Sequence, residues 1–178
     1  MKLVVGLGNP GKQYENTRHN LGFIFANRLK ERLGDGVWKK EKKLHADVAK
    51  LRAGEQTLIF AKPQTFMNDS GISVQKLCAY YKADPSELWV LHDDLDLPPG
   101  TIRTAFNSRS AGHNGVQSII DALGTQAFHR IRIGIGSAKQ HGQEAERYVL
   151  ERIPKDDWTA IKAAWNAKED SLLKEFGS

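Results

Sequence analysis

His19 is the residue of this chain best suited to act as a general base. It stands two residues before Leu21, where a helical apolar pattern begins, and so lies in or next to the first turn of a helix. The positive end of the helix dipole disfavours a charged imidazole, which keeps the side chain neutral near pH 7, as a base requires. A buried carboxylate bonded to the second ring nitrogen would fix the tautomer and stabilise the cation formed on proton abstraction. Asp93, at the end of the apolar run ELWVLHD, is the candidate for that carboxylate.

Side-chain amides follow other strand-like runs. Asn9 comes after LVVGL, and Asn68 and Asn114 each stand near a predicted helix start. Since ligands of open α/β sheets bind outside the carboxyl ends of the strands, these amides are expected to face the same crevice as His19. The alternative role for Asn68 and Asn114 is to cap their helices. Asp69 and Ser70 follow Asn68 directly and can cap equally well, which would free its amide for a substrate.

Further side chains near these positions have two possible roles. The SAGHNG segment places His113 at the start of the third predicted helix, where it either faces the crevice or packs and caps. Phe66 and Met67 either fill the core or form a platform that faces a substrate, because they stand among polar loop residues.

A metal site is the rival interpretation of the acidic segment. His92, Asp93, Asp94 and Asp96 could combine with His113, and Asp94 and Asp96 should point to the same side of an extended chain. The segment continues directly into LPPG, however, and no H-x-x-x-H pair follows it. A metal site is therefore disfavoured, and the absence of G-x-S-x-G disfavours a serine hydrolase of that type.

The opening string VVGLGNPG matches the dinucleotide pattern G-x-G-x-x-G at Gly6, Gly8 and Gly11. In the dinucleotide fold the third glycine already lies in a helix, whose N-terminus receives the pyrophosphate. Here the polar stretch KQYENTRHN follows Gly11, and no helical stripe appears before Leu21. The pattern therefore indicates a glycine-rich loop after a central strand rather than a nicotinamide or flavin site.

Strand-like runs and helical patterns alternate along the chain. Strands are predicted at residues 3–7, 45–53, 56–62, 87–93, 101–106 and 131–136, and helices at 21–33, 74–81, 116–123 and 158–176. This interleaving predicts an α/β fold, a single three-layer domain with a mixed, twisted sheet flanked by helices. The adjacent runs around Gly54 predict a hairpin, and the dense stretch Lys39, Lys40, Lys42 and Lys43 is expected to be a loop.

Length and composition suit one catalytic domain over residues 1–178. No apolar run approaches the ~20 residues that span a bilayer, and the chain begins with a strand-like segment rather than a signal peptide. Cys78 is the only cysteine, which excludes an internal disulfide and fits a cytoplasmic location. The formal net charge of +5 favours a polyanionic partner if the charge gathers on one face. The alternative is solvated charge spread over the surface.

Motifs spread over most of the chain resemble those of one known family. They are VVGLGNPGKQYENTRHNLG, KPQTFMNDSG, LHDDLDLPPG, GHNGVQSII and FHRIRIGIG, in this order. Together they are similar to bacterial-type peptidyl-tRNA hydrolases, from Lys2 to about Ile153. The resemblance implies a single α/β domain that acts as a monomer and needs no metal or cofactor.

The implied reaction is cleavage of the ester between the C-terminal carbonyl of a peptide and the 3′ ribose of tRNA, which recycles the tRNA for translation. The resemblance makes His19 the base that activates water, Asp93 the residue that orients it, and Asn9 a neighbour of the ester that helps to distinguish peptidyl from aminoacyl substrates. Asn68 and Asn114 would hold the substrate backbone or terminal nucleotide. The side chains implied to line the groove are those of Tyr14, Phe66, Met67 and His113.

An ester needs only modest catalytic machinery. Its alkoxide is a better leaving group than an amine, so one base and one or two amide donors at the developing oxyanion suffice. No covalent nucleophile is required.

Arginines are the candidates for contacts with tRNA phosphates. Arg132 stands where the family has its phosphate-binding arginine, and Arg103, Arg109 and Arg130 are further candidates, with solvated surface arginine as the alternative for each. The chain departs from the family at Ala105, near the place of a family lysine for which Arg109 could substitute. It also ends at KEFGS, short of the basic ending common in the family.

The alternative function is that of a relative that binds RNA or protein without catalysis, because the same fold resembles a chloroplast intron-splicing factor. The set Asn9, His19, Asp93 and Asn114 favours the enzyme, since a pure binding protein does not require it.

Overall fold

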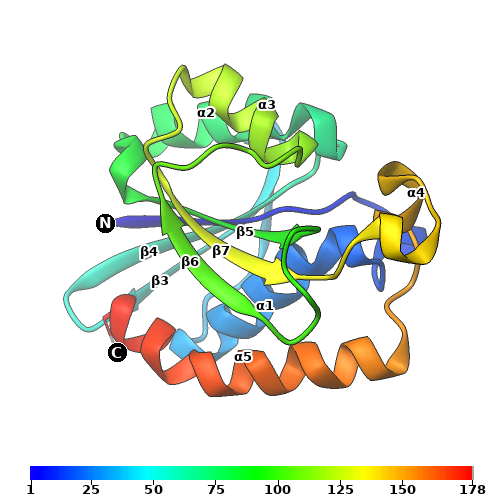
Figure 1. Cartoon of the computed structure of the whole chain (residues 1–178). Coiled ribbons are helices and arrows are strands. Elements are labelled where there is room, and N and C mark those ends of the chain that lie inside the picture. The colour runs from blue at the N-terminus through cyan, green and yellow to red at the C-terminus, as the bar shows by residue number, and fades with distance from the viewer. Residues whose placement is uncertain (178) are drawn as a thin grey trace.

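A seven-stranded mixed sheet forms the centre of the protein (Figure 1). The computed structural model describes residues 1–177, apart from the side chain of Gln140; Ser178, the last residue of the expected domain, lies outside this range. The strand order is β2-β3-β4-β1-β5-β7-β6. The strands are β1 (Lys2–Gly6), β2 (Lys39–Glu41), β3 (Ala46–Ala53), β4 (Gln56–Pro63), β5 (Leu88–Asp94), β6 (Ile102–Phe106) and β7 (His129–Gly134).

The four central strands run parallel. β1 is parallel to both of its neighbours, β4 and β5, and β5 is parallel to β7. β2, β3 and β6 are antiparallel to the strands beside them. The residues that follow β1, β4 and β5 therefore gather at one edge of the sheet, which is where open α/β sheets bind ligands. The hairpin predicted around Gly54 is confirmed as β3 and β4.

Helices cover both faces of the sheet. Figure 1 shows α1 (Leu21–Leu33) and α5 (Lys155–Glu175) below it, and α2 (Ser70–Tyr81) and α3 (Asn114–Leu123) above it. Alternate residues of β1 supply the two cores: Val4 packs with the α1 and α5 side, whereas Leu3 and Val5 pack with the α2 and α3 side. The three-layer α/β fold is thus confirmed. A short helix, α4 (Ala145–Val149), lies before α5 and was not predicted.

Glycine allows α1 to start against the end of β1. A Cβ atom on Gly22 would lie 2.3 Å from the carbonyl oxygen of Leu91 and 2.4 Å from the backbone nitrogen of Leu7. The polar stretch after Gly11 forms only the 3-10 turns Lys12–Tyr14 and Arg18–Asn20 before the helix. The opening glycines therefore serve backbone packing and turns, in agreement with the rejection of a dinucleotide helix.

Some element boundaries differ from those expected. The lysine-rich stretch is not a loop, because Lys39–Glu41 form the exposed edge strand β2 and Lys42–Leu44 form a 3-10 turn. A short, charged strand is a common way to protect a sheet edge from pairing with other chains. α2 begins earlier than predicted, at Ser70. Among residues 1–177, no helix has the length and apolar character needed to cross a membrane.

Candidate active site

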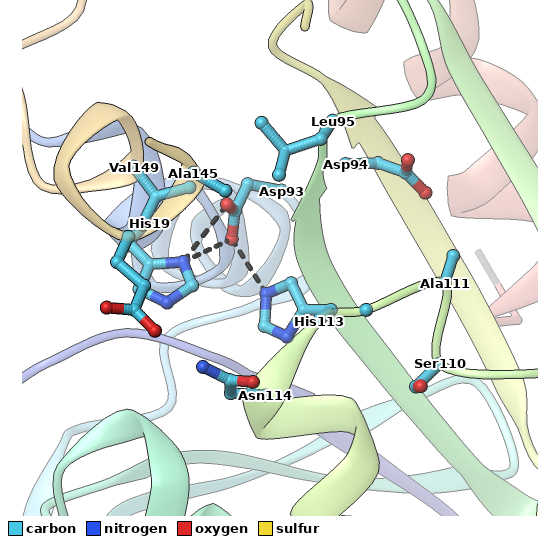
Figure 2. Close-up of a pocket in the computed structure, with 12 residues that line it drawn as sticks. His19, Asp93, Asp94, Leu95, Ser110, Ala111, His113, Asn114, Ala145 and Val149 are labelled. Atoms are coloured by element: carbon cyan, nitrogen blue, oxygen red, sulfur yellow. Dashed lines mark hydrogen bonds and ion pairs between the residues drawn. The ribbon is translucent and has the colours of Figure 1, made fainter. Parts of the chain in front are cut away.

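His19 and Asp93 meet at the carboxyl edge of the sheet. His19 lies in the 3-10 turn directly before α1, and Asp93 is the second-last residue of β5. Both are buried, and Nδ1 of His19 lies 3.0 Å from each carboxylate oxygen of Asp93 (Figure 2). Because a carboxylate only accepts hydrogen bonds, Nδ1 carries the proton. Nε2 is then the ring nitrogen that can accept a proton from water.

His113 donates a second hydrogen bond to Asp93. Its Nε2 lies 2.9 Å from Oδ1 of Asp93, and its Nδ1 accepts from the backbone N–H of Val116 at 3.2 Å. The bond from Val116 fixes the His113 proton on Nε2 and makes this residue the N-cap of α3. Figure 2 shows the carboxylate of Asp93 between the two imidazole rings. His113 therefore both caps its helix and belongs to the site.

The pKa of His19 lies above its ordinary value of 6.5. Burial lowers this pKa, but the negative charge of Asp93 and the hydrogen bond to it outweigh burial. The expectation that the helix start holds His19 neutral is therefore wrong in direction, because a carboxylate in direct contact outweighs a partial charge of about +0.5 at a helix N-terminus. Burial alone would raise the pKa of Asp93, yet the neighbouring His19 and His113 hold it well below its usual range. Asp93 thus stays ionised when His19 takes up a proton.

His92 lies beside this network as a neutral ring. Burial, together with the neighbouring His113, lowers its pKa to about 3. Its Nδ1 lies 2.7 Å from the backbone oxygen of Asp93, and its ring packs edge-on against that of His113, with centroids 4.8 Å apart. The ring therefore supports both partners of the Asp93–His113 hydrogen bond.

Asn9 is held with its amide NH₂ available as a donor. Its Oδ1 accepts from the backbone N–H of Met67 at 2.8 Å, which fixes which end of the amide is oxygen. The side chain of Asn20 bonds both backbone groups of Asn9, accepting from its N–H at 2.8 Å and donating to its C=O at 2.9 Å. The donor of Asn9 is therefore positioned by two other segments of the chain.

Two adjoining cavities open beside His19. The inner chamber has a volume of 180 Å³ and includes Asp93 and His113 in its walls. The outer chamber has a volume of 340 Å³ and includes Asn9, Tyr14, Phe66, Met67, Asn68 and Leu150. Residues His19, Asn114, Glu146 and Val149 line both chambers.

The predicted site residues other than Arg132 line these two chambers. Phe66 is 60% exposed, whereas Met67 is buried in the core, and both side chains line the outer chamber. Asn68 does not cap α2, whose N-cap is Asp69, and its amide lies exposed at the groove. Asn114 is the first residue of α3 and is not its cap.

Arg132 lines neither chamber but is bonded to Asp94, which lines the inner one. Its Nε donates to Oδ2 of the buried Asp94 at 2.6 Å, while a quarter of the Arg132 side chain is exposed. Arg130 is instead buried, and its guanidinium donates to the backbone oxygens of Ser108 and Arg109. Arg130 therefore stabilises the loop at Ser108 and Arg109 and is not placed to bind a phosphate. Arg103 and Arg109 are exposed.

The wall formed by α4 was missed by the sequence analysis. Glu146 and Val149 line both chambers, Ala145 lines the inner one and Leu150 the outer one. A helix of five residues is too short to show a periodic pattern in the sequence. Arg18 holds this wall in place: its guanidinium stacks on Tyr148, 3.8 Å from the ring centroid, and donates to the Tyr148 backbone oxygen and to Glu151. Asn20 was also missed, since nothing in its sequence context distinguishes it from a helix-capping residue.

The distances between side-chain atoms near Asp93 bear on the rival interpretation, a metal site. One possible ligand atom from each of His19, Asp93 and His113 lies within 4.8 Å of the other two. The carboxylate is, however, already bonded to both rings at 2.9–3.0 Å, which is hydrogen-bond spacing. Of the other acids considered in the rival metal interpretation, Asp94 pairs with Arg132 and Asp96 is exposed, and neither belongs to this group of three.

Comparisons with known proteins identify the family of this chain. The family model described as peptidyl-tRNA hydrolase matches residues 3–176. A peptidyl-tRNA hydrolase of Mycobacterium ulcerans is 48% identical over 177 residues, covering 98% of this chain and 92% of the relative, and one of Desulforamulus reducens is 44% identical over 164 residues, covering 92% and 77%. The crystal structure of peptidyl-tRNA hydrolase from Acinetobacter baumannii superposes with a TM-score of 0.90 at 34% identity, covering 99% of this chain and 88% of that one. The chain therefore belongs to the peptidyl-tRNA hydrolase family.

Proposed function

We propose that this protein cleaves the ester between the C-terminal carbonyl of a peptide and the 3′ oxygen of tRNA, with His19 as the general base. The observation that carries the proposal is the contact of His19 Nδ1 with both oxygens of the buried Asp93. This contact leaves Nε2 as the proton acceptor beside a groove lined by side-chain amides. A protein that only binds RNA or protein has no need of such a base.

In the first step, Nε2 of His19 takes a proton from a water molecule, and the water oxygen attacks the ester carbonyl carbon. Negative charge then develops on the carbonyl oxygen, and the amide NH₂ of Asn9 is placed to donate to it. Asp93 stabilises the imidazolium without taking its proton, because its own pKa is held low.

In the second step, the tetrahedral intermediate collapses and the bond to the 3′ oxygen breaks. The imidazolium of His19 returns its proton to this oxygen as it leaves. The products are a peptide with a free carboxyl group and a tRNA with a free 3′ hydroxyl. The enzyme ends in its starting protonation state.

The same groove provides places for the rest of the substrate. The exposed ring of Phe66 offers a surface on which a nucleobase can stack. Asn68 and Asn114 present amides that can bond the terminal nucleotide or the peptide backbone, and Tyr14 and Met67 complete the wall. Arg132 is the proposed contact for a tRNA phosphate. A cation–phosphate contact would position the RNA without reading its sequence.

We further propose that residues 1–178 act as one catalytic domain, as a monomer in the cytoplasm and without a metal or cofactor. The proposal of one domain is supported by the sheet and its helices, since β5 supplies Asp93 and the 3-10 turn before α1 supplies His19. Burial and the nearby Asp84 raise the pKa of the Cys78 thiol to about 11, which favours the protonated thiol near pH 7.

The test is release of peptide from an N-acetylated aminoacyl-tRNA in the presence of EDTA. Wild-type protein should release it, and His19→Ala should lower kcat/KM by about 10²- to 10⁴-fold while still binding the substrate in a filter assay. No release by the wild type either with or without EDTA would overturn the function. Undiminished turnover by His19→Ala would overturn the assigned base, and loss of wild-type activity in EDTA alone would overturn metal-free catalysis.

A further inference from the structure

Glu146 occupies the junction of the two chambers. It lines both the inner and the outer cavity, together with His19, Asn114 and Val149. The side chain is exposed, and none of the ion pairs among residues 1–177 involves its carboxylate. A negative charge is therefore available at the place where the two cavities meet.

The other charges of the chamber walls are already matched. Asp93 is bonded to two imidazoles, and Asp94 is paired with Arg132 at 2.6 Å. In the outer chamber Glu146 is the one carboxylate, and no lysine or arginine belongs to the described lining. The walls around the reacting bond thus carry an unmatched negative charge.

Apolar surface adjoins this charge. Val149 lies in the same short helix as Glu146, and Leu150 directly follows that helix. Phe66 lies in the wall of the same chamber. Leu150 and Phe66 are 44% and 60% exposed. An aliphatic chain that ends in a cation fits such a surface, since its methylenes can cover the apolar groups while its charge meets the carboxylate.

The charge also distinguishes between the two parts of the substrate. A carboxylate repels RNA phosphates and attracts an ammonium or guanidinium group. The part of the substrate that can supply such a cation is the peptide. We propose that Glu146 is a specificity-determining residue that favours peptidyl-tRNAs whose C-terminal amino acid is lysine or arginine. This inference rests on the hydrolase function proposed above.

Two substrates on the same tRNA test this preference. Nα-acetyl-lysyl-tRNA carries a side-chain ammonium, whereas Nα,Nε-diacetyl-lysyl-tRNA does not. Because both substrates carry the same tRNA, the contribution of the RNA contacts cancels in the ratio of their kcat/KM values. Wild-type protein at low salt should prefer the charged substrate by about two- to five-fold, which corresponds to one solvent-accessible ion pair. Glu146→Gln should bring the ratio to one, and Glu146→Lys should bring it below one. Glu144→Gln, which changes an exposed residue outside both chambers, should keep the wild-type ratio.

The outcomes separate this inference from the function on which it rests. Hydrolysis of neither substrate overturns the hydrolase function itself. Hydrolysis of both with equal kcat/KM, or a preference that survives Glu146→Gln, overturns the role of Glu146 alone. If Glu146→Gln slows cleavage of lysyl-tRNA with a free α-amino group but leaves the ratio of the acetylated substrates unchanged, the carboxylate reads the α-amino group and the inference is also overturned.

Discussion

Gly6 and Gly22 face each other so closely that a Cβ atom on Gly6 would lie 2.3 Å from the carbonyl oxygen of Gly22. The first residue ends β1 and the second lies in the first turn of α1, so strand and helix are in backbone contact. His19 stands immediately before this helix. The close approach therefore determines where the imidazole lies relative to Asp93 on the neighbouring strand β5.

Replacing Gly22 with alanine tests this packing. The added methyl group meets backbone atoms of Leu91 and Leu7, which cannot move aside as a side chain can. We expect Gly22→Ala to lower the free energy of unfolding by about 3 kcal/mol, at the upper end of the usual cost of overpacking. Urea denaturation measures the change. Glu31→Ala, at an exposed position of the same helix, should stay within about 0.5 kcal/mol of wild type, and an equally small effect of Gly22→Ala would contradict the close approach.

The activity should rise with pH through an apparent pKa above 6.5, because neutral His19 is the active form and its pKa is raised. Asp93→Asn removes the charge that raises this pKa and leaves burial unopposed. We therefore expect the midpoint of the kcat/KM profile to shift to lower pH, and the plateau rate to fall by about 10²- to 10⁴-fold. A midpoint that stays in place in Asp93→Asn would show that another group is being titrated.

The titration of His19 that raises activity with pH should lower its contribution to stability. A folded-state pKa above the unfolded value means that the contribution of His19 to stability is fully present below about pH 6.5 and is lost as pH rises through the folded pKa. The difference in free energy of unfolding between wild type and His19→Ala should therefore shrink as the pH rises over this window. Urea melts of both proteins at several pH values measure it, and a constant or growing difference would contradict the raised pKa.

The two bonds of His113 can be separated by mutation. His113→Ala loses both the cap of α3 and the hydrogen bond to Asp93, so we expect about 1 kcal/mol less stability and lower activity. His113→Asn should recover the stability, because asparagine is a good N-cap, but its short side chain cannot also reach Asp93. Comparing urea melts with kcat/KM therefore isolates the second bond. Full activity in His113→Asn would mean that this bond does not position Asp93.

The contact of His19 with Asp93 could be predicted because each residue has a strong local signal. One stands at a helix start and the other at the end of a buried strand, and parallel strands bring such ends together. The direction of the His19 pKa could not be predicted in the same way. It depends on a 3.0 Å contact between segments far apart in the chain, which outweighs the local helix dipole.

Arg130 and Arg132 show a second limit of sequence reasoning. They alternate along β7 with apolar residues and so appear equivalent at a spacing of two. Their different roles arise from the loop at Ser108 and Arg109, whose carbonyl groups accept from Arg130 and leave Arg132 nearer to solvent. The path of a loop over a sheet leaves no periodic signal in the sequence.

The proposed phosphate contact of Arg132 should appear in the salt dependence of activity on full-length tRNA. Only its Nε is bonded to another residue among those described, so the outer nitrogens of the guanidinium are available to a phosphate. Removing Arg132 alone would leave Asp94 buried without a cation, and we therefore choose the double variant Arg132→Gln, Asp94→Asn, in which two amides replace the ion pair. In this variant the slope of log(kcat/KM) against log salt concentration should decrease in magnitude by about 0.7–0.9, as expected for the loss of one phosphate contact. The single variant Asp94→Asn keeps the arginine and should keep the full slope. A double variant with the wild-type slope would show that Arg132 does not contact the RNA backbone.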